Sequence, residues 1–263
     1  FAKEVDSLDP IFLSDLLRFK KRDTQLTPEA EAELIDSWQK MIIEGGVVQG
    51  GDMSHGALSL TAHRAIGGAF NDLGGVSGSG EGGEHAERRT GGKWEGDISK
   101  RRQLASGRFG ATAEFFSDPA ITEVCIKIGQ GAKPGEGGQL PAHKLTADIA
   151  AQRRTQAGIE TISPPTNHDV YSIEDLALLI SSIRALNPKL KICVKIPAVS
   201  NIGTIAVGVA KAGADTITVA GFEGGTGAAQ VSSIEHCGLP RELGLAECHQ
   251  MLTKDGVRDL IEL

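Results

Sequence analysis

Short apolar runs and amphipathic stretches alternate along the second half of the chain. Residues 172–186 open with the capping signal S-x-x-D and continue with apolar residues at helical spacing until an Asn-Pro pair ends them. Residues 203–211 predict a second helix, made of small residues. Four apolar runs have the length and composition of strands, at residues 124–128, 160–162, 192–196 and 216–220.

The first half of the chain has a weaker pattern. Residues 1–46 form a lead segment, in which the sequence T-P-E at 27–29 predicts the start of a helix that ends at a glycine pair. An apolar run at 47–53 predicts a strand, and the next helix is expected to end at about residue 71. Residues 85–105 are rich in charge and glycine, which favours a long excursion rather than a core element.

The recurring order of strand and helix predicts an α/β fold with a parallel sheet covered by helices. Periodicity alone leaves open whether that sheet closes into a barrel. In either case the ligand chemistry is expected at the carboxyl ends of the strands.

Composition and charge argue against several classes of binding partner. The 263 residues have a formal net charge of −7 and a pI near 5.5, which argues against nucleic acid or an anionic membrane as the main partner. No apolar stretch approaches the ~20 residues that a membrane span needs. The four cysteines show no C-x-x-C pair and the seven histidines no H-x-H or H-E-x-x-H pair. We therefore expect no metal site, and reduced thiols in a cytoplasmic compartment.

A glycine-rich stretch after the strand at 124–128 contains most of the candidate chemistry. Five glycines between residues 129 and 138 allow tight backbone bends. The stretch also contains basic and amide side chains, with very few apolar residues between them. Such a loop suits an anion, although a solvated surface loop has the same composition.

Six longer motifs together resemble the FMN-binding domain of glutamate synthase, which makes glutamate from 2-oxoglutarate. They are GDMSHGALSLTAH (51–63), LGGVSGSGEGGEH (73–85), SGRFG (106–110), IKIGQGAKPGEGGQLPAHK (126–144), ISPPTNHDVYSIEDL (162–176) and GGTGAAQVSSIEHCGLPRELGLAECHQ (224–250). The resemblance implies a (β/α)8 TIM barrel over residues 47–263, with FMN at its carboxyl mouth.

The resemblance also assigns residues to the cofactor. Met53 and Ser54 would lie along the flavin, and Lys195 would face its electron-rich pyrimidine side, where a cation stabilises the anionic reduced form. A strand-end lysine that reaches solvent is the alternative for Lys195. The loop Gly224, Gly225, Thr226 and Gly227 would cradle the FMN phosphate with backbone N–H groups and one hydroxyl.

The substrate residues come from the glycine-rich stretch. By resemblance, Lys133, Gln139 and Arg153 would bind the two carboxylates of 2-oxoglutarate, and Lys127 and Gln130 would lie nearer the reacting carbon. Glu81 would exchange protons where ammonia condenses with the keto group, although a loop carboxylate serving a glycine nest or a helix end is the alternative. Reduced FMN would then deliver hydride to the resulting imine.

Some parts of the family are absent from this sequence. These are a final phosphate-binding loop, a cysteine cluster for a 3Fe-4S centre, a glutaminase domain and a C-terminal β-helix. We therefore expect about six of eight βα units and a barrel incomplete at the C-terminus. The electron donor would be ferredoxin or an NADPH-dependent subunit, and a plastid location fits a photosynthetic source.

Departures from the usual family sequence flank the expected site. Glycine stands at position 78 where asparagine is usual, and His85 stands where an acid is usual. His55 is expected to face solvent. These changes leave two alternatives open, namely another FMN-dependent barrel oxidoreductase acting on an oxo acid, and a non-catalytic remnant or assembly subunit.

Overall fold

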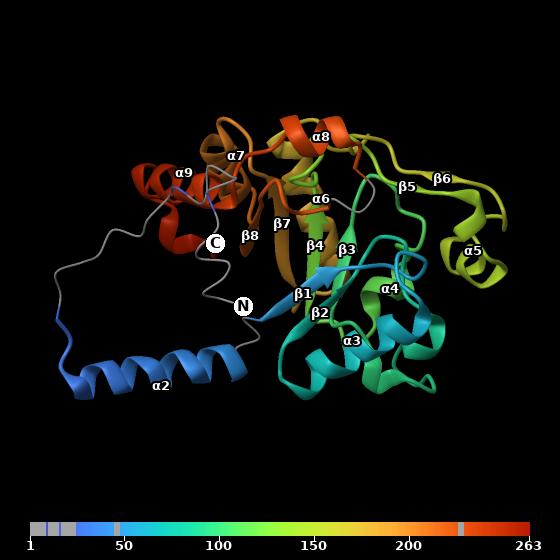
Figure 1. The fold of residues 1–263 in the computed structure, drawn as a ribbon, viewed down its shortest axis with the longest axis horizontal. Coiled ribbons are helices and arrows are strands. Elements are labelled where there is room, and N and C mark those ends of the chain that lie inside the picture. Colours follow the sequence, from blue (N-terminus) through green and yellow to red (C-terminus); the bar gives the residue numbers. More distant parts are fainter. Residues whose placement is uncertain (1–8, 10–15, 17–24, 45–47, 226–228) are drawn as a thin grey trace.

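The computed structural model describes residues 9, 16, 25–44, 48–225 and 229–263, and its centre is a six-stranded parallel sheet. The strands are β1 (Gln49–Asp52), β2 (Val76–Ser79), β3 (Arg101–Leu104), β4 (Glu123–Lys127), β7 (Lys191–Pro197) and β8 (Thr216–Ala220). They lie side by side in chain order, and the sheet is curled, with β1 and β8 at its edges (Figure 1). This arrangement confirms the predicted α/β fold and is that of an incomplete (β/α)8 barrel.

Helices and short turns connect the strands. They are α2 (Pro28–Glu44), α3 (Leu60–Asp72), α4 (Ala113–Ser117), α5 (Ala147–Arg153), α6 (Ile173–Leu186), α7 (Ile202–Lys211), α8 (Val231–His236) and α9 (Arg241–Lys254), with 3-10 turns η2 (Ala86–Arg88), η3 (Glu95–Asp97), η4 (Ala142–Lys144) and η6 (Arg258–Leu260). Ser59 caps α3, and Ser172 caps α6 by accepting a hydrogen bond from the Asp175 N–H. The predicted start of α6 is therefore confirmed.

The hydrophobic core lies on the helix-covered face of the sheet. Val124, Ile126, Ile192 and Val194 alternate along β4 and β7 and are at most 1% exposed. They belong to one cluster with apolar residues of α6, α7 and α9. Strand alternation sends the other set of side chains to the concave face, which is the inside of the incomplete barrel.

That concave face is polar. Parallel pairing puts Lys127 of β4 beside Lys195 of β7. At the opposite, amino end, the Arg101 guanidinium donates to the Asp52 carboxylate (Nε to Oδ1, 2.7 Å), and both side chains are nearly buried. A Cβ at position 78 would overlap that carboxylate, so the glycine there makes room for the ion pair.

The charge-rich segment at 85–105 is not the long excursion outside the core that its composition favours. It contains η2, η3 and β3, and every residue of β3 is buried. β2 was also missed, because its sequence V-S-G-S offers almost no apolar signal. Both strands belong to the parallel sheet, so the composition of this half concealed two of its six strands.

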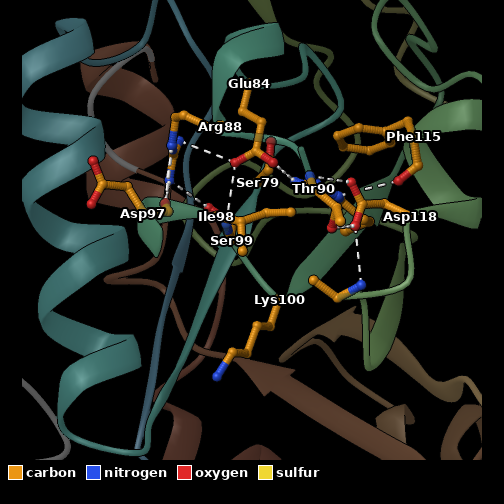
Figure 2. A network of polar contacts seen from close by, with 12 residues as sticks. Ser79, Glu84, Arg88, Thr90, Asp97, Ile98, Ser99, Lys100, Phe115 and Asp118 are labelled. Atoms are coloured by element: carbon orange, nitrogen blue, oxygen red, sulfur yellow. Dashed lines mark hydrogen bonds and ion pairs between the residues drawn. The ribbon is translucent and has the colours of Figure 1, made fainter. Parts of the chain in front are cut away.

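Three fully buried charged side chains hold this segment against the sheet. The Glu84 carboxylate forms ion pairs with Arg88 (Oε2 to Nη1, 3.1 Å) and with Arg102. It also accepts a hydrogen bond from the Ser99 N–H at 3.2 Å, as Figure 2 shows. The Arg102 guanidinium lies over the Phe115 ring, 4.4 Å from its centroid. Because each charge has an opposite partner, their burial is tolerated.

The predicted strand at 160–162 corresponds to a two-residue strand outside the main sheet. β6 (Thr161–Ile162) pairs in antiparallel fashion with β5 (Gln139–Leu140), and this hairpin extends away from the parallel strands toward α5 (Figure 1). The predicted strand is therefore confirmed, but it lies outside the parallel sheet that the order of strands and helices predicted. A run of three residues contains too little pattern to separate the two kinds of strand.

The last described residues begin to extend the sheet at its β8 edge. The Ile217 N–H donates to the Glu262 carbonyl oxygen at 2.8 Å, and Thr216 and Glu262 form a parallel bridge.

At the other end of the chain, α2 has an exposed face that includes Trp38. The proposed boundary at residue 46 falls within 45–47, outside the described residues. Among the helices that the structure describes, none has the length and apolar character to cross a membrane.

The buried His63 of α3 should make the stability of the protein depend measurably on pH. Its side chain is 2% exposed, and neither ring nitrogen has a hydrogen-bond partner within the described structure. Burial, with repulsion from Arg88, His55 and Arg102, lowers its pKa from 6.5 to about 3. Between these pH values the unfolded chain takes up a proton that the folded chain does not, so stability falls as pH decreases.

We therefore expect His63→Gln to flatten the acid limb of the stability curve. Because glutamine does not titrate, the free energy of unfolding should lose up to about 1.4 kcal/mol per pH unit of its slope below pH 6.5. Urea denaturation at several pH values from 6.5 to 4.5 measures both slopes. Equal slopes for the wild type and the variant would contradict the buried, neutral state of His63.

Candidate active site

An acid and a lysine from two strand ends meet at the carboxyl end of the sheet. Glu81 follows β2 and Lys127 ends β4, and the Lys127 Nζ lies 3.0 Å from the Glu81 Oε1. Gln103 of β3 donates a hydrogen bond to the other oxygen of the same carboxylate. Burial raises the pKa of Glu81, but the Lys127 charge and the hydrogen bonds outweigh it, so the pKa lies below its ordinary value.

A cavity adjoins this ion pair. Its lining residues come from the end of β4, from the loops after β2, β3 and β4 and from the segment after β6, and include Glu81, Ser106, Lys127, Gln130, Glu136 and Ser163. The three residues predicted as catalytic, Glu81, Lys127 and Gln130, are therefore brought together around one space. Close approach of the loops after β4 and β8 shapes its edge, because a Cβ on Gly131 would overlap the Gly221 carbonyl oxygen.

Arg153, at the end of α5, is a buried cation beside this site. Its side chain reaches the Ser54 hydroxyl (Nη2 to Oγ, 3.0 Å) and lies near the Phe109 ring, 5.8 Å from its centroid. The residue is 8% exposed, its Nε has no hydrogen-bond partner, and no carboxylate among the described residues forms an ion pair with it. Burial lowers its pKa, against the attraction of Glu81. A buried guanidinium without a carboxylate is poised to receive an anion.

The other two predicted substrate residues differ in their positions. Lys133 is 3% exposed, and its Nζ donates to the Gly137 carbonyl oxygen at 3.0 Å. Burial lowers its pKa, with Glu136 opposing. Gln139, in contrast, is exposed on β5, where its amide donates to Glu160 across the hairpin. Lys133 lies in the cavity loop, whereas the structure does not bring Gln139 to the cavity lining.

The predicted cofactor residues lie at the carboxyl ends of three strands. Met53 and Ser54 follow β1, and the Met53 N–H donates to the Gly78 carbonyl oxygen at 3.3 Å. Lys195, near the end of β7, is partly exposed, and its side-chain Nζ has no hydrogen-bond or ion-pair partner within the described part of the chain.

The glycine loop after β8 is only partly described. The Gly224 N–H donates to the Gly221 carbonyl oxygen at 3.0 Å, and the Gly224 carbonyl oxygen accepts from the Ala132 N–H at 2.9 Å. Gly225 has a positive φ and lies against the Gln130 side chain. Thr226 and Gly227 lie outside the described residues.

Comparison with known proteins identifies the family. A family model described as a conserved region in glutamate synthase matches residues 4–263. The chain belongs to the glutamate synthase family. It is 45% identical over 267 residues to the large chain of the NADPH glutamate synthase of Azospirillum brasilense, covering 100% of this chain and 17% of that protein. Against the chloroplastic ferredoxin-dependent glutamate synthase of Spinacia oleracea, identity is 46% over 269 residues, which is 95% of this chain and 16% of the relative.

The relatives differ in the electron donor that their names give. Besides the NADPH and ferredoxin types, the NADH glutamate synthase of Saccharomyces cerevisiae is 43% identical over 258 residues, covering 97% of this chain and 12% of that protein. The chain thus spans about a sixth or less of these glutamate synthases. The comparison therefore identifies the family, and does not assign the reaction of the complete proteins to this region.

Two contacts at this glutamate synthase site were not predicted from the sequence. Gln103 holds Glu81, and only the alternation of β3 could have indicated that it faces inward. His55 was expected to face solvent, but it is 4% exposed and hydrogen-bonded to Asp148 of α5. That prediction was wrong because packing with a segment 93 residues away is invisible locally. No group of three or more potential metal ligands suited to an ion occurs among the described residues.

Proposed function

We propose that this chain is the region of a glutamate synthase that carries out the FMN-dependent reductive amination of 2-oxoglutarate with ammonia to L-glutamate. The observation that carries the proposal is Arg153, a buried cation that lacks a carboxylate partner among the described residues and adjoins the Glu81–Lys127 pair. Its planar fork suits a carboxylate. The relatives' names support the product but describe much longer proteins.

In this proposal different residues of the chain bind different groups of the substrate. Arg153 and Lys133 bind its carboxylates, and Lys127 and Gln130 orient the keto group at the cavity. The Glu81 carboxylate, ionised at neutral pH because its pKa is lowered, accepts a proton from the condensing nitrogen at its oxygen. The resulting carboxylic acid returns that proton to the carbinolamine hydroxyl, which leaves as water, and the regenerated carboxylate stabilises the positive charge that develops on nitrogen. Gln139 remains a predicted substrate residue that would need the hairpin to move.

The concave face also fits FMN. Lys195 supplies a cation with no described partner, which suits the anionic pyrimidine side of a reduced flavin, and Met53 and Ser54 would line the ring. Gly225, with Thr226 and Gly227, would hold the phosphate, whereas the Gly224 N–H is already used within its own turn. When bound, FMN supplies the hydride for the reduction.

The remaining partners are proposed from the relatives. Ferredoxin or a nicotinamide-nucleotide-dependent subunit would supply electrons, and free ammonia or a glutaminase domain would supply nitrogen. The 3Fe-4S centre that the sequence resemblance implies would bind outside this region, because we assign none of the four cysteines to it.

Replacing Arg153 by lysine tests the proposal. The protein, with FMN and a chemical reductant, should form glutamate from 2-oxoglutarate and ammonium. Arg153→Lys should raise KM for 2-oxoglutarate about tenfold, because lysine keeps the charge but loses the two-pronged contact. Product formation is measured by chromatography of the amino acid.

The neighbouring arginine offers a matched control. Arg154→Lys changes an exposed side chain that lies 3.6 Å from the Glu114 carboxylate, and its KM should equal that of the wild type. Absence of glutamate formation by a flavin-loaded wild type would refute the proposed reaction. An unchanged KM in Arg153→Lys would refute the role of Arg153.

A further inference from the structure

Asp148, in the first turn of α5, contacts histidines from two other loops. Its Oδ2 lies 2.6 Å from the Nε2 of His55, in the loop after β1, and its Oδ1 lies 3.5 Å from the Nε2 of His85, which precedes η2. The two rings are 5.9 Å apart and almost perpendicular. We call Asp148, His55 and His85 the Asp148 clasp.

The two histidines are fixed independently of Asp148. His55 is 4% exposed, and its backbone N–H donates to the Gly83 carbonyl oxygen at 2.9 Å. The His85 ring accepts a hydrogen bond from the Glu87 N–H at Nδ1 and packs on the Trp94 ring. The side chain of Asp148, in contrast, is 55% exposed. The imidazoles therefore form a fixed receptor, and Asp148 is the group that docks onto it.

The Asp148 carboxylate is hydrogen-bonded to the His55 ring, and the Nε2 of His85 faces its other oxygen at 3.5 Å. Because the Nδ1 of His85 accepts a bond, the neutral ring carries its proton on Nε2, which faces Asp148. The Nδ1 of His55 is buried without a partner among the described residues, so a proton there would be an unpaired buried donor. The His55 proton therefore also resides on Nε2, pointed at the carboxylate.

The clasp and the substrate arginine lie on one short helix. Asp148 and Arg153 are five residues apart, or about 7.5 Å along the axis of α5. They attach to consecutive residues of the same loop, because Arg153 bonds Ser54 and Asp148 bonds His55. α5 lies at the end of the hairpin arm, away from the parallel sheet (Figure 1).

Apolar packing around α5 is limited. The cluster that includes its Ala150 contains only Leu140 and Leu145 as further buried members. Polar attachment at both ends of α5 is thus a large part of what orients it. Loss of the attachment at Asp148 would leave Arg153 on a helix that can tilt about its carboxyl end.

We propose that the Asp148 clasp is a positioning device that docks α5 and thereby sets the Arg153 guanidinium for a dicarboxylate substrate. The assignment of the substrate rests on the proposed function. The docking of α5 itself does not.

Amide hydrogen exchange and kinetics on Asp148→Ala test both parts. Without the carboxylate, peptides that cover residues 147–154 should exchange about tenfold faster, in protein without FMN. In flavin-loaded protein, KM for 2-oxoglutarate should rise about tenfold with kcat unchanged, because the defect is one of placement. In an Arg153→Ala background, Asp148→Ala should raise KM no further.

Glu174→Ala is the matched control, since Glu174 is an exposed acid in the first turn of α6. It removes a charge favourable to a helix start, but should change neither exchange at α5 nor KM. Unchanged exchange in Asp148→Ala would overturn the clasp. Additive KM effects with Arg153→Ala would overturn the positioning role and leave a general structural one. If the wild type does not use 2-oxoglutarate, the proposed function fails, and the exchange measurement alone decides the clasp.

Discussion

Replacement of Glu84 by glutamine is expected to lower the free energy of unfolding by about 3–5 kcal/mol, the largest stability effect predicted for this protein. The Glu84 carboxylate is the shared partner of Arg88 and Arg102, and all three side chains are 0% exposed (Figure 2). Glutamine keeps the shape of the side chain but leaves two buried guanidinium charges without their shared ion-pair partner. Burial already lowers the pKa of both arginines, and Glu84 is the main group that opposes this.

Urea denaturation followed by far-UV circular dichroism measures the difference. Glu114→Gln provides the control, because Glu114 forms an exposed ion pair with Arg154 at 3.6 Å and its loss should leave the free energy of unfolding almost unchanged. A loss below about 1 kcal/mol in Glu84→Gln would mean that solvent reaches the arginines. The ion pairs would then not be what holds the segment between β2 and β3.

The Glu84 cluster also explains why the sequence predicted one half of the fold better than the other. The strands β7 and β8 and the helices α6 and α7 have apolar runs and caps that act locally, and all four were predicted. β3 has the sequence R-R-Q-L and is buried only because Glu84, Asp52 and Glu123 supply opposite charges from distant positions. A pattern of single residues cannot reveal such partners.

The same distinction applies to the site. Family resemblance named Glu81, Lys127 and Gln130, and the structure places them around one cavity. Resemblance could not reveal that Gln103 holds Glu81 or that Asp148 docks onto His55, because each contact joins segments far apart in the chain. Elements that depend on local sequence could thus be predicted from it. Contacts that join side chains far apart in the chain could not.

The second large effect is expected at Glu81, where Glu81→Gln should lower the turnover of glutamate formation about 100-fold. Glutamine retains a hydrogen-bond acceptor for Lys127, which lies 3.0 Å from the carboxylate, so the cavity should keep its shape. It can neither accept a proton from nitrogen nor offset positive charge on the imine. KM for 2-oxoglutarate should change little, because Arg153 and Lys133 bind the carboxylates in the proposed arrangement.

The pH profile makes this prediction specific to the carboxylate. Glu81 has its pKa lowered below 4.5, so in the wild type its ionised form persists through the neutral range and is lost only below that pH. Protonation of Glu81 should therefore contribute no acid limb above about pH 5. Glu223→Gln is the control. Glu223 lies on the loop after β8 and its carboxylate pairs with the exposed Arg241, so this variant should retain wild-type turnover. If Glu81→Gln retained more than about a third of the wild-type rate, proton transfer and charge stabilisation in this site would have to come from a group other than Glu81.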